Sequence, residues 1–373
     1  MKKIGLISYH SGHNYGTMLQ AYALQQVINL LGDNIVEYIN YIDGKSFKYA
    51  SWKVRLEKIV AKFKLGLFQL SYSLLYRKKN REVSEKFESF LNSYISISEK
   101  SYTSINELKK NPPIYDVYIV GSDQTWNPTF LKDNSAYFLS FVEDSKLSKN
   151  SYASSLGVYS LSKETQQSYI KYLSSFNLIS CREKVNAERL ASLLNRSVEY
   201  VLDPTLLLDA DAWCKIEKKS DIPKAYVLCY CLGTKRSVRN FARQLGIKHN
   251  LSVLYIASSY QDVFYSKTLF GIGPLEFLYL VRNATYICTD SFHGTVFSIN
   301  YRKNFYSFFK RNGNERNGDN SRIYYLLQEM SLLNRLKYDD FIEEPDIDYG
   351  NVSLYLEQMR IKSISFLKQI LQC

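Results

Sequence analysis

The sequence lacks an apolar run of about 18 residues, the length that a membrane-spanning helix needs. The apolar stretch near Met1 is also too short for a secretory signal peptide. The six cysteines are scattered, and no second pair joins Cys229 and Cys231 to complete a metal site. Neither an internal repeat nor a G-x-G-x-x-G loop is present, so a solenoid and a bound dinucleotide are not indicated. We therefore expect a cytoplasmic protein with reduced cysteines and no resident cofactor.

The composition is ordinary for a globular protein, at 46% hydrophobic and 23% charged residues. A chain of 373 residues is too long for one typical core and predicts two domains. Tyrosine is abundant, with 32 residues. Sugar-facing surfaces can be rich in tyrosine, but a general composition bias explains the abundance equally well.

Positive charge gathers in one segment of the chain. The net charge is +12, and residues 51–81 carry nine basic side chains that only Glu57 opposes. Apolar residues are interleaved at helical spacing, which predicts a basic amphipathic helix within a helical insertion of about 51–94. Such a helix either lies peripherally on the inner face of an anionic membrane or packs its apolar stripe on the domain. No nucleic-acid-binding motif accompanies the charge, so a nucleic-acid partner is not indicated.

The pattern of the first half is that of a doubly wound α/β domain. Lys3 to Ser8 predicts a buried strand, Thr17 to Leu31 an amphipathic helix ended by Gly32, and Asn34 to Ile39 a second strand. Further apolar runs, at 116–120, 178–181 and 198–202, predict more strands of the same kind. Strands that alternate with helices indicate a parallel sheet.

A second α/β series follows a connection at 206–223. It is predicted from a strand at 226–231, a helix at 235–245 and a strand at 252–256, and it closes with an amphipathic helix at 352–371. The fold class is therefore α/β with two Rossmann-like domains, which we place at residues 1–208 and 209–373. Two halves of similar size predict a cleft between them, where two-domain enzymes commonly hold ligands.

The most informative segment is Thr289 to Thr295. It follows an apolar strand-like run and precedes Val296 to Ile299, which begins a helix. His293 therefore lies at the carboxyl end of a strand, where open α/β sheets bind ligands. Asp290 is expected to orient the imidazole and raise its pKa, so that His293 acts as a general acid. The alternative is a histidine that only caps the local turn.

The same turn predicts an anion site. Free backbone N–H groups at Gly294, Thr295 and Val296 would point to one spot beside Ser291 and His293. Arg182 follows another strand end, at Cys181, and can hold a phosphate or carboxylate bidentately. The alternative for Arg182 is a surface arginine paired with Glu183.

Two loops could hold sugar hydroxyls. His10, His13 and Asn14 lie in a glycine-bearing loop between the first strand and helix, and Asp123 with Trp126 follows the strand that ends at Val120. An acid can bind hydroxyls while an aromatic ring covers the apolar face of a sugar. The alternatives are a tight turn in the first loop, and a capping aspartate with a core tryptophan in the second.

A polar loop begins at Lys310 and Arg311. Its basic side chains could close on an anion. A flexible, solvated loop is the alternative.

Taken together, several blocks resemble the polysaccharide pyruvyl transferase family. They occur in the family's order over most of the chain: His13 to Leu24, Val120 to Asn127, Ser180 to Glu183, Val201 to Thr205 and Thr289 to Gly294. The resemblance implies a fold similar to the two-domain GT-B glycosyltransferases. It also implies transfer of the enolpyruvyl unit of phosphoenolpyruvate to hydroxyls of a cell-surface polysaccharide or its lipid-linked precursor.

The resemblance further implies that His293 acts on phosphoenolpyruvate, a co-substrate, and that Arg182 binds it. Family members often carry arginine where this chain has Ser291, so Lys310 and Arg311 are expected to supply part of the donor site. In the first loop, Gly16-Thr17 stands where classical members have Gly-Asp. Two alternatives remain: a GT-B glycosyltransferase that uses a nucleotide sugar, and a non-catalytic glycan-binding homologue.

Overall fold

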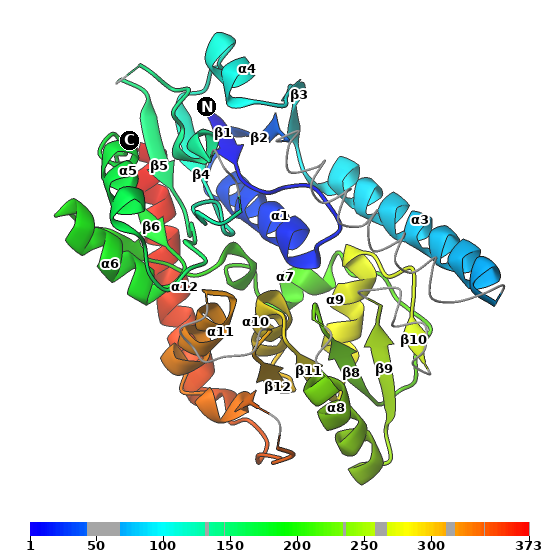
Figure 1. Ribbon diagram of the computed structural model, residues 1–373. Coiled ribbons are helices and arrows are strands. Elements are labelled where there is room, and N and C mark those ends of the chain that lie inside the picture. The colour runs from blue at the N-terminus through cyan, green and yellow to red at the C-terminus, as the bar shows by residue number, and fades with distance from the viewer. Residues whose placement is uncertain are drawn as a thin grey trace.

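The computed structural model describes residues 1–42, 68–130, 134–144, 146–233, 236–257, 267–310, 318–338 and 340–372. These residues form two parallel sheets flanked by helices, one sheet from each half of the chain (Figure 1). A long C-terminal helix completes the fold. The α/β class, the two Rossmann-like sheets and the terminal helix are thus confirmed.

The first sheet has the strand order β3-β2-β1-β4-β5, and every pairing is parallel. Isolated bridges from Asn150 to Leu178 and from Ser154 to Cys181 extend it to a short pair, β6-β7. Its strands are β1 Lys3–Ile7, β2 Ile35–Tyr41, β3 Ile97–Tyr102, β4 Val117–Val120, β5 Ser148–Ser151, β6 Ser180–Cys181 and β7 Glu199–Tyr200. Its helices are α1 Tyr15–Leu30, α3 Phe68–Tyr94, α4 Ile105–Lys110, α5 Lys163–Leu173 and α6 Lys184–Leu194, with 3-10 turns at Ser135–Phe138 and Pro204–Leu206.

The second sheet has the order β10-β9-β8-β11-β12-β13, again parallel throughout. Its strands are β8 Tyr226–Tyr230, β9 Ser252–Ile256, β10 Thr268–Leu269, β11 Tyr286–Thr289, β12 Asn304–Phe308 and β13 Leu336–Lys337. Its helices are α7 Ala210–Cys214, α8 Arg236–Lys248, α9 Pro274–Asn283, α10 Phe292–Asn300, α11 Gly318–Glu329 and α12 Tyr349–Gln372, with a 3-10 turn at Leu333–Arg335.

In both sheets the winding reverses beside the first strand. The reversal lies between β1 and β4 in the first sheet and between β8 and β11 in the second. Loops that leave neighbouring strands at such a point diverge to opposite faces and open a crevice at the carboxyl edge. Asp123 lies in the loop after β4, and His293 lies in the first turn of α10, just after β11, so both residues lie at switch points.

Aromatic side chains pack the two halves together. Tyr15 of α1 stacks on Phe277 of α9 with ring centroids 4.4 Å apart, and its hydroxyl donates to the Ile272 carbonyl at 2.9 Å. Trp213 lies between Tyr22 of α1 and Phe297 of α10, with centroid distances of 5.6 and 5.1 Å. These contacts are buried in one continuous core that includes residues of both sheets. The position of α1 relative to α10 is therefore fixed by packing.

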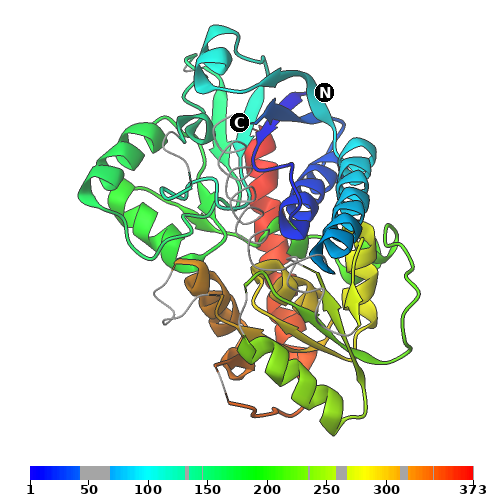
Figure 2. The ribbon, with the colours of Figure 1, turned by 45° about the vertical axis from the view of Figure 1, so that its right-hand side comes forward.

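The C-terminal helix α12 starts in the second half and runs back along the first (Figure 2). Its Ser363 hydroxyl accepts from the Leu202 amide at 3.0 Å, and Arg360 donates to the Leu206 carbonyl at 2.6 Å. Near its end, the Leu371 carbonyl accepts from Lys2 at 2.9 Å. The helix thus joins both halves of the chain.

Residues 51–67 of the predicted basic helix lie outside the described residues. The insertion ends as expected at Tyr94, in α3, where Phe87 and Phe90 are buried in the core. Farther up the helix, Lys79 and Arg81 pair with Glu82 and Glu85 at 3.2 and 3.0 Å.

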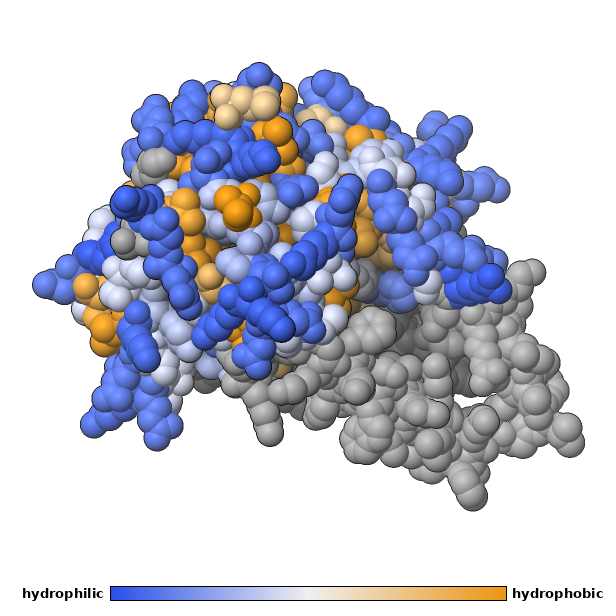
Figure 3. All heavy atoms as spheres, turned by 90° about the horizontal axis from the view of Figure 1, so that it is seen from above, coloured by the Kyte–Doolittle hydropathy of each residue, from blue (hydrophilic) through white to orange (hydrophobic). Residues whose placement is uncertain are grey.

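The face shown in Figure 3 is mostly hydrophilic, with hydrophobic side chains in small separate groups. In the described part of the chain, no helix is both long enough and apolar enough to span a bilayer.

Trp126 is a core residue, so its predicted role against a sugar is wrong. Its side chain is fully buried, stacks on Phe138 at 5.6 Å and meets Phe176 edge-on. The indole N–H donates to the Tyr137 carbonyl at 2.9 Å. A buried indole finds its hydrogen-bond partner within the fold, and here the surrounding aromatics leave no sugar-facing surface.

We expect Trp126→Ala to lower the free energy of unfolding by about 3–5 kcal/mol, because it leaves a large cavity and an unpaired carbonyl. Trp126→Phe should cost less, since it keeps most of the ring contacts. Urea unfolding followed by circular dichroism measures both changes. Wild-type stability in the alanine variant would contradict the core assignment.

Candidate active site

The candidate site centres on Arg182, which follows β6. Its guanidinium contacts three carboxylates: Asp203 at 2.7 Å, Asp123 at 3.2 Å and Glu183 at 3.3 Å. It also lies 4.6 Å from the ring centroid of Phe292. The side chain is 0% exposed. Burial alone would lower the pKa of Arg182, but the three carboxylates raise it above its usual value. Arg182 is therefore charged, and its guanidinium is bound by carboxylates of the protein. The prediction that it binds the donor directly is wrong.

Asp203 has several hydrogen-bond partners in the cluster. One carboxylate oxygen accepts from the Thr205 amide and hydroxyl at 3.0 and 2.6 Å. The other accepts from Arg182 and from the Ser122 hydroxyl at 3.3 Å. Burial opposes ionisation, but His293, Arg182 and Thr205 outweigh it and hold the pKa of Asp203 well below its usual range. Asp203 is thus an anion in the folded protein.

His293 lies in the first turn of α10, as the sequence predicts, and points toward the first half of the chain. Its Nε2 is 3.7 Å from the Asp203 Oδ2, beyond hydrogen-bond distance. This buried nitrogen finds no hydrogen-bond partner among the described residues. Its side chain is 9% exposed. A buried polar atom without a partner indicates a group that binds there, because leaving it unpaired is costly.

Gly16 makes room for that imidazole. A Cβ added at Gly16 would lie 1.9 Å from the Nδ1 of His293. Gly16 lies in the first turn of α1. It lets the histidine of the second half rest against α1. His293 and Arg182 both lie beside Asp203, at 3.7 and 2.7 Å from its Oδ2, and both side chains are buried.

Asp290 does not orient His293, contrary to our expectation. Its carboxylate accepts from the backbone amides of Leu232 and Gly233 at 2.6 and 3.0 Å. Burial raises the pKa of Asp290. Asp290 therefore ties the loop after β8 to the loop after β11, and Asp203 is the acid beside the imidazole.

The predicted anion cradle at the start of α10 is also wrong. Ser291 is the N-cap, and its hydroxyl accepts from the Gly294 amide at 3.2 Å. The Thr295 amide donates to the Ser291 carbonyl at 3.0 Å, and the Thr295 hydroxyl bonds Ser307 at 2.7 Å. A capped helix terminus has fewer N–H groups to offer an anion. Gly294 itself packs against Thr289, where a Cβ would lie 2.4 Å from the hydroxyl oxygen.

The acceptor residues expected in the first loop are dispersed. His10 is buried against Tyr38, its Nδ1 lies 3.0 Å from the Ser8 carbonyl, and burial lowers its pKa, so an acceptor-binding role for it is wrong. Asn14 is the N-cap of α1 and accepts from the Thr17 amide at 3.2 Å. His13 is exposed beside Phe87.

Asp123, by contrast, joins the cluster. It has a left-handed backbone with φ of 66°, and its side chain accepts from Thr17 at 3.2 Å as well as from Arg182. Burial would raise its pKa, but Arg182, His293 and Arg322 hold the pKa of Asp123 below its usual value. A non-glycine residue with positive φ at a functional centre is common.

The remaining basic residues flank the cluster. Lys310 is near Asp290 and helps to lower the pKa of that carboxyl against the effect of burial. Arg311 lies outside the described residues. Arg322 of α11 lies 5.6 Å from the Phe292 centroid, so this ring has two guanidinium neighbours. With the Gln124 amide oriented to face it, the amide oxygen lies 3.2 Å from both terminal nitrogens of Arg322.

Sequence reasoning missed Asp203 as the acidic partner and Arg322 as a neighbour of Asp123. The Asp-Pro-Thr signal at 203–205 could have indicated a capping carboxylate, but not what else it touches. Among the residues that the structure describes, no group of three or more His, Cys, Asp or Glu is placed to hold a metal ion.

The lowered pKa of Asp203 predicts a pH-dependent contribution to stability. Its ionised form favours the folded state, so this contribution is complete above the ordinary carboxyl pKa of about 4 and is lost as pH falls below it. The stability difference between wild type and Asp203→Asn should therefore be largest near pH 7 and shrink toward pH 3. Urea titrations across that range test this. Asp221→Asn, an exposed control, should show no such trend, and an equal trend in both would contradict the assignment.

Gly16→Ala should displace the His293 ring, although alanine is otherwise the better helix former. The chain has four histidines, so their imidazole signals can be followed by NMR. We expect the His293 signal to move, with the signals of His10 and His249 unchanged. Gly32→Ala, where only the flexible Asn34 amide is near, is the matched control. Four unaltered signals in Gly16→Ala would disprove the contact.

Comparison with solved structures shows a shared fold. UDP-GlcNAc 2-epimerase from Methanocaldococcus jannaschii is 12% identical, covers 97% of this chain and 91% of its own, and has a TM-score of 0.50. The enzyme of the same name from Neisseria meningitidis is 12% identical over the full length of both chains, with a TM-score of 0.49. The Escherichia coli ADP-heptose LPS heptosyltransferase II is 11% identical, covers 99% of each chain and has a TM-score of 0.36. These are GT-B-like proteins, and at such identity the first likeness shows the fold alone.

No curated protein matches the chain. A family model, described as polysaccharide pyruvyl transferase, matches residues 14–308. The matched region includes Gly16, Asp123, Arg182, Glu183, Asp203 and His293, whereas Lys310 and Arg322 lie beyond its end. Since this match spans most of the sequence, the chain belongs to the polysaccharide pyruvyl transferase family.

Proposed function

We propose that this protein transfers the pyruvyl unit of phosphoenolpyruvate to hydroxyls of a cell-surface polysaccharide or its lipid-linked precursor. The observation that carries the proposal is the environment of His293. Its Nε2 is buried, has no hydrogen-bond partner among the described residues and lies 3.7 Å from the Asp203 carboxylate. A histidine beside a buried anion, where the two Rossmann-like halves meet, is suited to deliver a proton to a substrate.

His293 gives its proton to the methylene carbon of phosphoenolpyruvate, which becomes a methyl group and leaves C2 electrophilic. One sugar hydroxyl adds to C2 and loses its proton, which restores the protonated imidazole. A second hydroxyl of the same sugar then displaces phosphate from C2 and gives its proton to it. Two C–O bonds form and one C–O bond to phosphate breaks, so the products are a pyruvate ketal and inorganic phosphate.

Asp203 positions the imidazole and stabilises its positive form. Arg182 acts indirectly, because it pairs with Asp203, Asp123 and Glu183 and holds their loops together. Asp123 receives the proton of the first acceptor hydroxyl and returns it to His293. Its side chain keeps 13% exposure, whereas that of Arg182 has none.

The donor then needs cations other than Arg182. Arg322 is near Asp123 and Lys310 is near Asp290, and we assign the donor phosphate and carboxylate to these two basic residues of the second half. In this proposal, Arg322 and Lys310 take the place of the arginine that family members often carry at position 291. In this chain that position is Ser291, which caps α10.

His293→Gln should reduce phosphate release from phosphoenolpyruvate, in the presence of a sugar panel, by about two to four orders of magnitude. The loss is expected because no other proton donor faces the donor carbon in this scheme. His249→Gln is the control, because His249 pairs with Glu343 and takes no part in the cluster around Arg182. It should retain full release of phosphate. Circular dichroism checks that both variants are folded.

Three outcomes separate the possible functions. Turnover lost only in His293→Gln supports the proposal, and retained turnover in that variant overturns the role of His293. Calorimetric binding of a nucleoside diphosphate without binding of phosphoenolpyruvate would indicate a GT-B glycosyltransferase instead. Sugar binding with no turnover of phosphoenolpyruvate by the wild type would indicate a glycan-binding homologue.

A further inference from the structure

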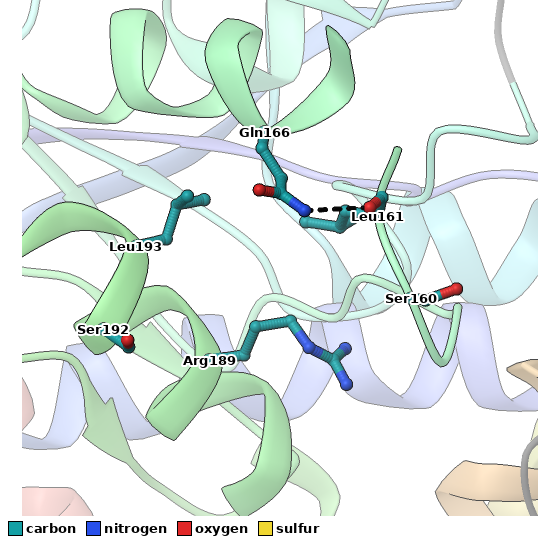
Figure 4. Close-up of a pocket in the computed structure, with 6 residues that line it drawn as sticks. All are labelled: Ser160, Leu161, Gln166, Arg189, Ser192 and Leu193. Carbon is teal, nitrogen blue, oxygen red and sulfur yellow. Dashed lines mark hydrogen bonds between the residues drawn. The ribbon is translucent and has the colours of Figure 1, made fainter. Parts of the chain in front are cut away.

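A second feature of the first half is a pocket beside the cluster, between α5, α6 and the loop that precedes α5 (Figure 4). Its volume is about 330 Å³, at the small end of the range for ligand sites. Six residues line it: Ser160, Leu161, Gln166, Arg189, Ser192 and Leu193. None of them was singled out by the sequence.

The lining combines an apolar floor with polar groups at the rim. Leu161 is buried and Leu193 is partly buried, whereas Ser160 and Ser192 are exposed. Gln166 donates from its amide nitrogen to the Leu161 carbonyl at 3.0 Å, which leaves its amide oxygen as an acceptor. In Figure 4, Gln166 and Arg189 approach from different helices. An apolar floor with convergent hydroxyl and amide groups suits a sugar ring, which has an apolar face and a hydroxyl edge.

The one charged side chain of this lining is Arg189, and it is positive. One of its terminal nitrogens donates to the Asn186 amide oxygen at 3.0 Å, and its guanidinium lies 5.6 Å from the Tyr159 ring. No carboxylate of the described residues forms an ion pair with it, in contrast to Arg182, which has three. A half-buried guanidinium without a protein carboxylate can bind a ligand carboxylate.

The pocket is joined to the candidate active site by a run of hydrogen bonds. Asn186 accepts from Arg189 and donates to Glu183 at 3.1 Å, and Glu183 in turn accepts from Arg182. Arg189 lies on α6, six residues after Glu183, the N-cap of that helix, which is about 9 Å along the helix axis. A ligand in this pocket is therefore near enough to belong to the same acceptor molecule.

We propose that this pocket binds a carboxylated sugar unit of the acceptor, adjacent to the unit that is modified. This inference rests on the proposed function for the identity of the acceptor, but binding in the pocket does not require the reaction. Arg189 binds the carboxylate, Gln166 and the two serines bind hydroxyls, and the leucines cover the apolar face of the ring. The site thereby selects acidic polysaccharides over neutral ones.

Binding is measured without phosphoenolpyruvate, by calorimetry or saturation-transfer NMR. The probes are a disaccharide that contains glucuronate, its neutral counterpart and inorganic phosphate. The wild type should bind the acidic disaccharide, and Arg189→Gln should weaken that binding about tenfold, since a charge-assisted hydrogen bond is lost. Arg243→Gln, which removes an exposed arginine from α8, is the matched control and should bind as the wild type does.

A second pair of variants tests the cavity itself. Ser192→Tyr fills the pocket without touching the hydrogen-bond run, and it should abolish binding of the acidic disaccharide. Ser365→Tyr places the same side chain on an exposed position of α12 and should have no effect. Folding of each variant is checked by thermal denaturation.

Equal affinity for the acidic and neutral disaccharides, no binding by the wild type, or unchanged binding in Arg189→Gln and Ser192→Tyr would each overturn the proposal. Arg189-dependent binding of inorganic phosphate alone would overturn it too, because the pocket would then be a simple anion site. Intact disaccharide binding with no turnover of phosphoenolpyruvate would count against the proposed function and leave this subsite standing. Turnover with an acceptor KM that is unchanged in Arg189→Gln would count against the subsite alone.

Discussion

The buried guanidinium of Arg182 is the constraint on which the site depends. Three carboxylates from three different loops surround it, and its positive charge offsets part of the cost of burying them. The charge that Arg182 supplies thus determines where Asp123, Glu183 and Asp203 lie. Removing such a partner is far more harmful than replacing a surface ion pair, because it leaves anions buried and unpaired.

A second dependence runs between the halves of the molecule. His293 comes from the second half, yet the groups that define its surroundings, Gly16 and Asp203, belong to the first. The aromatic contacts of Tyr15 and Trp213 fix the position of one half relative to the other. The environment of the imidazole is therefore a property of the interface, and a small shift of one half against the other would change the distance from Nε2 to Asp203.

Charge in this site is carried by side chains, and the helix terminus contributes little. Ser291 uses its hydroxyl to cap α10, and Asp290 uses its carboxylate to fasten the loop after β8. The turn at 290–295 was predicted to bind an anion through its backbone N–H groups. In the structure, side chains of the same turn form hydrogen bonds with backbone groups instead. The basic groups that we assign to ligands are Lys310, Arg322 and Arg189. Among the described residues, no carboxylate forms an ion pair with Arg189, whereas three contact Arg182.

Much of the fold follows from local pattern. The sequence predicts the strands β1, β8 and β11, because buried parallel strands are continuously hydrophobic. It also predicts the helices α1 and α12, because the apolar residues of an amphipathic helix recur every three to four positions. The exception is instructive: β5, Ser148–Ser151, is entirely polar yet buried. Its side chains donate to the carbonyls of Val142 and Ser180 and to one another, and no pattern within the strand reveals those distant partners.

The sequence by itself determined the α/β class, the family, and the placement of His293, Arg182 and Asp123 at strand ends, since each of these depends on residues that are neighbours along the chain. Only the tertiary structure decided that Asp203 and not Asp290 accompanies the imidazole, that Trp126 and His10 are packed away from ligands, and that Gly16 serves a side chain from the other half. The physical reason is that a side chain's partner is chosen by distance and burial, and both arise from how separate elements pack.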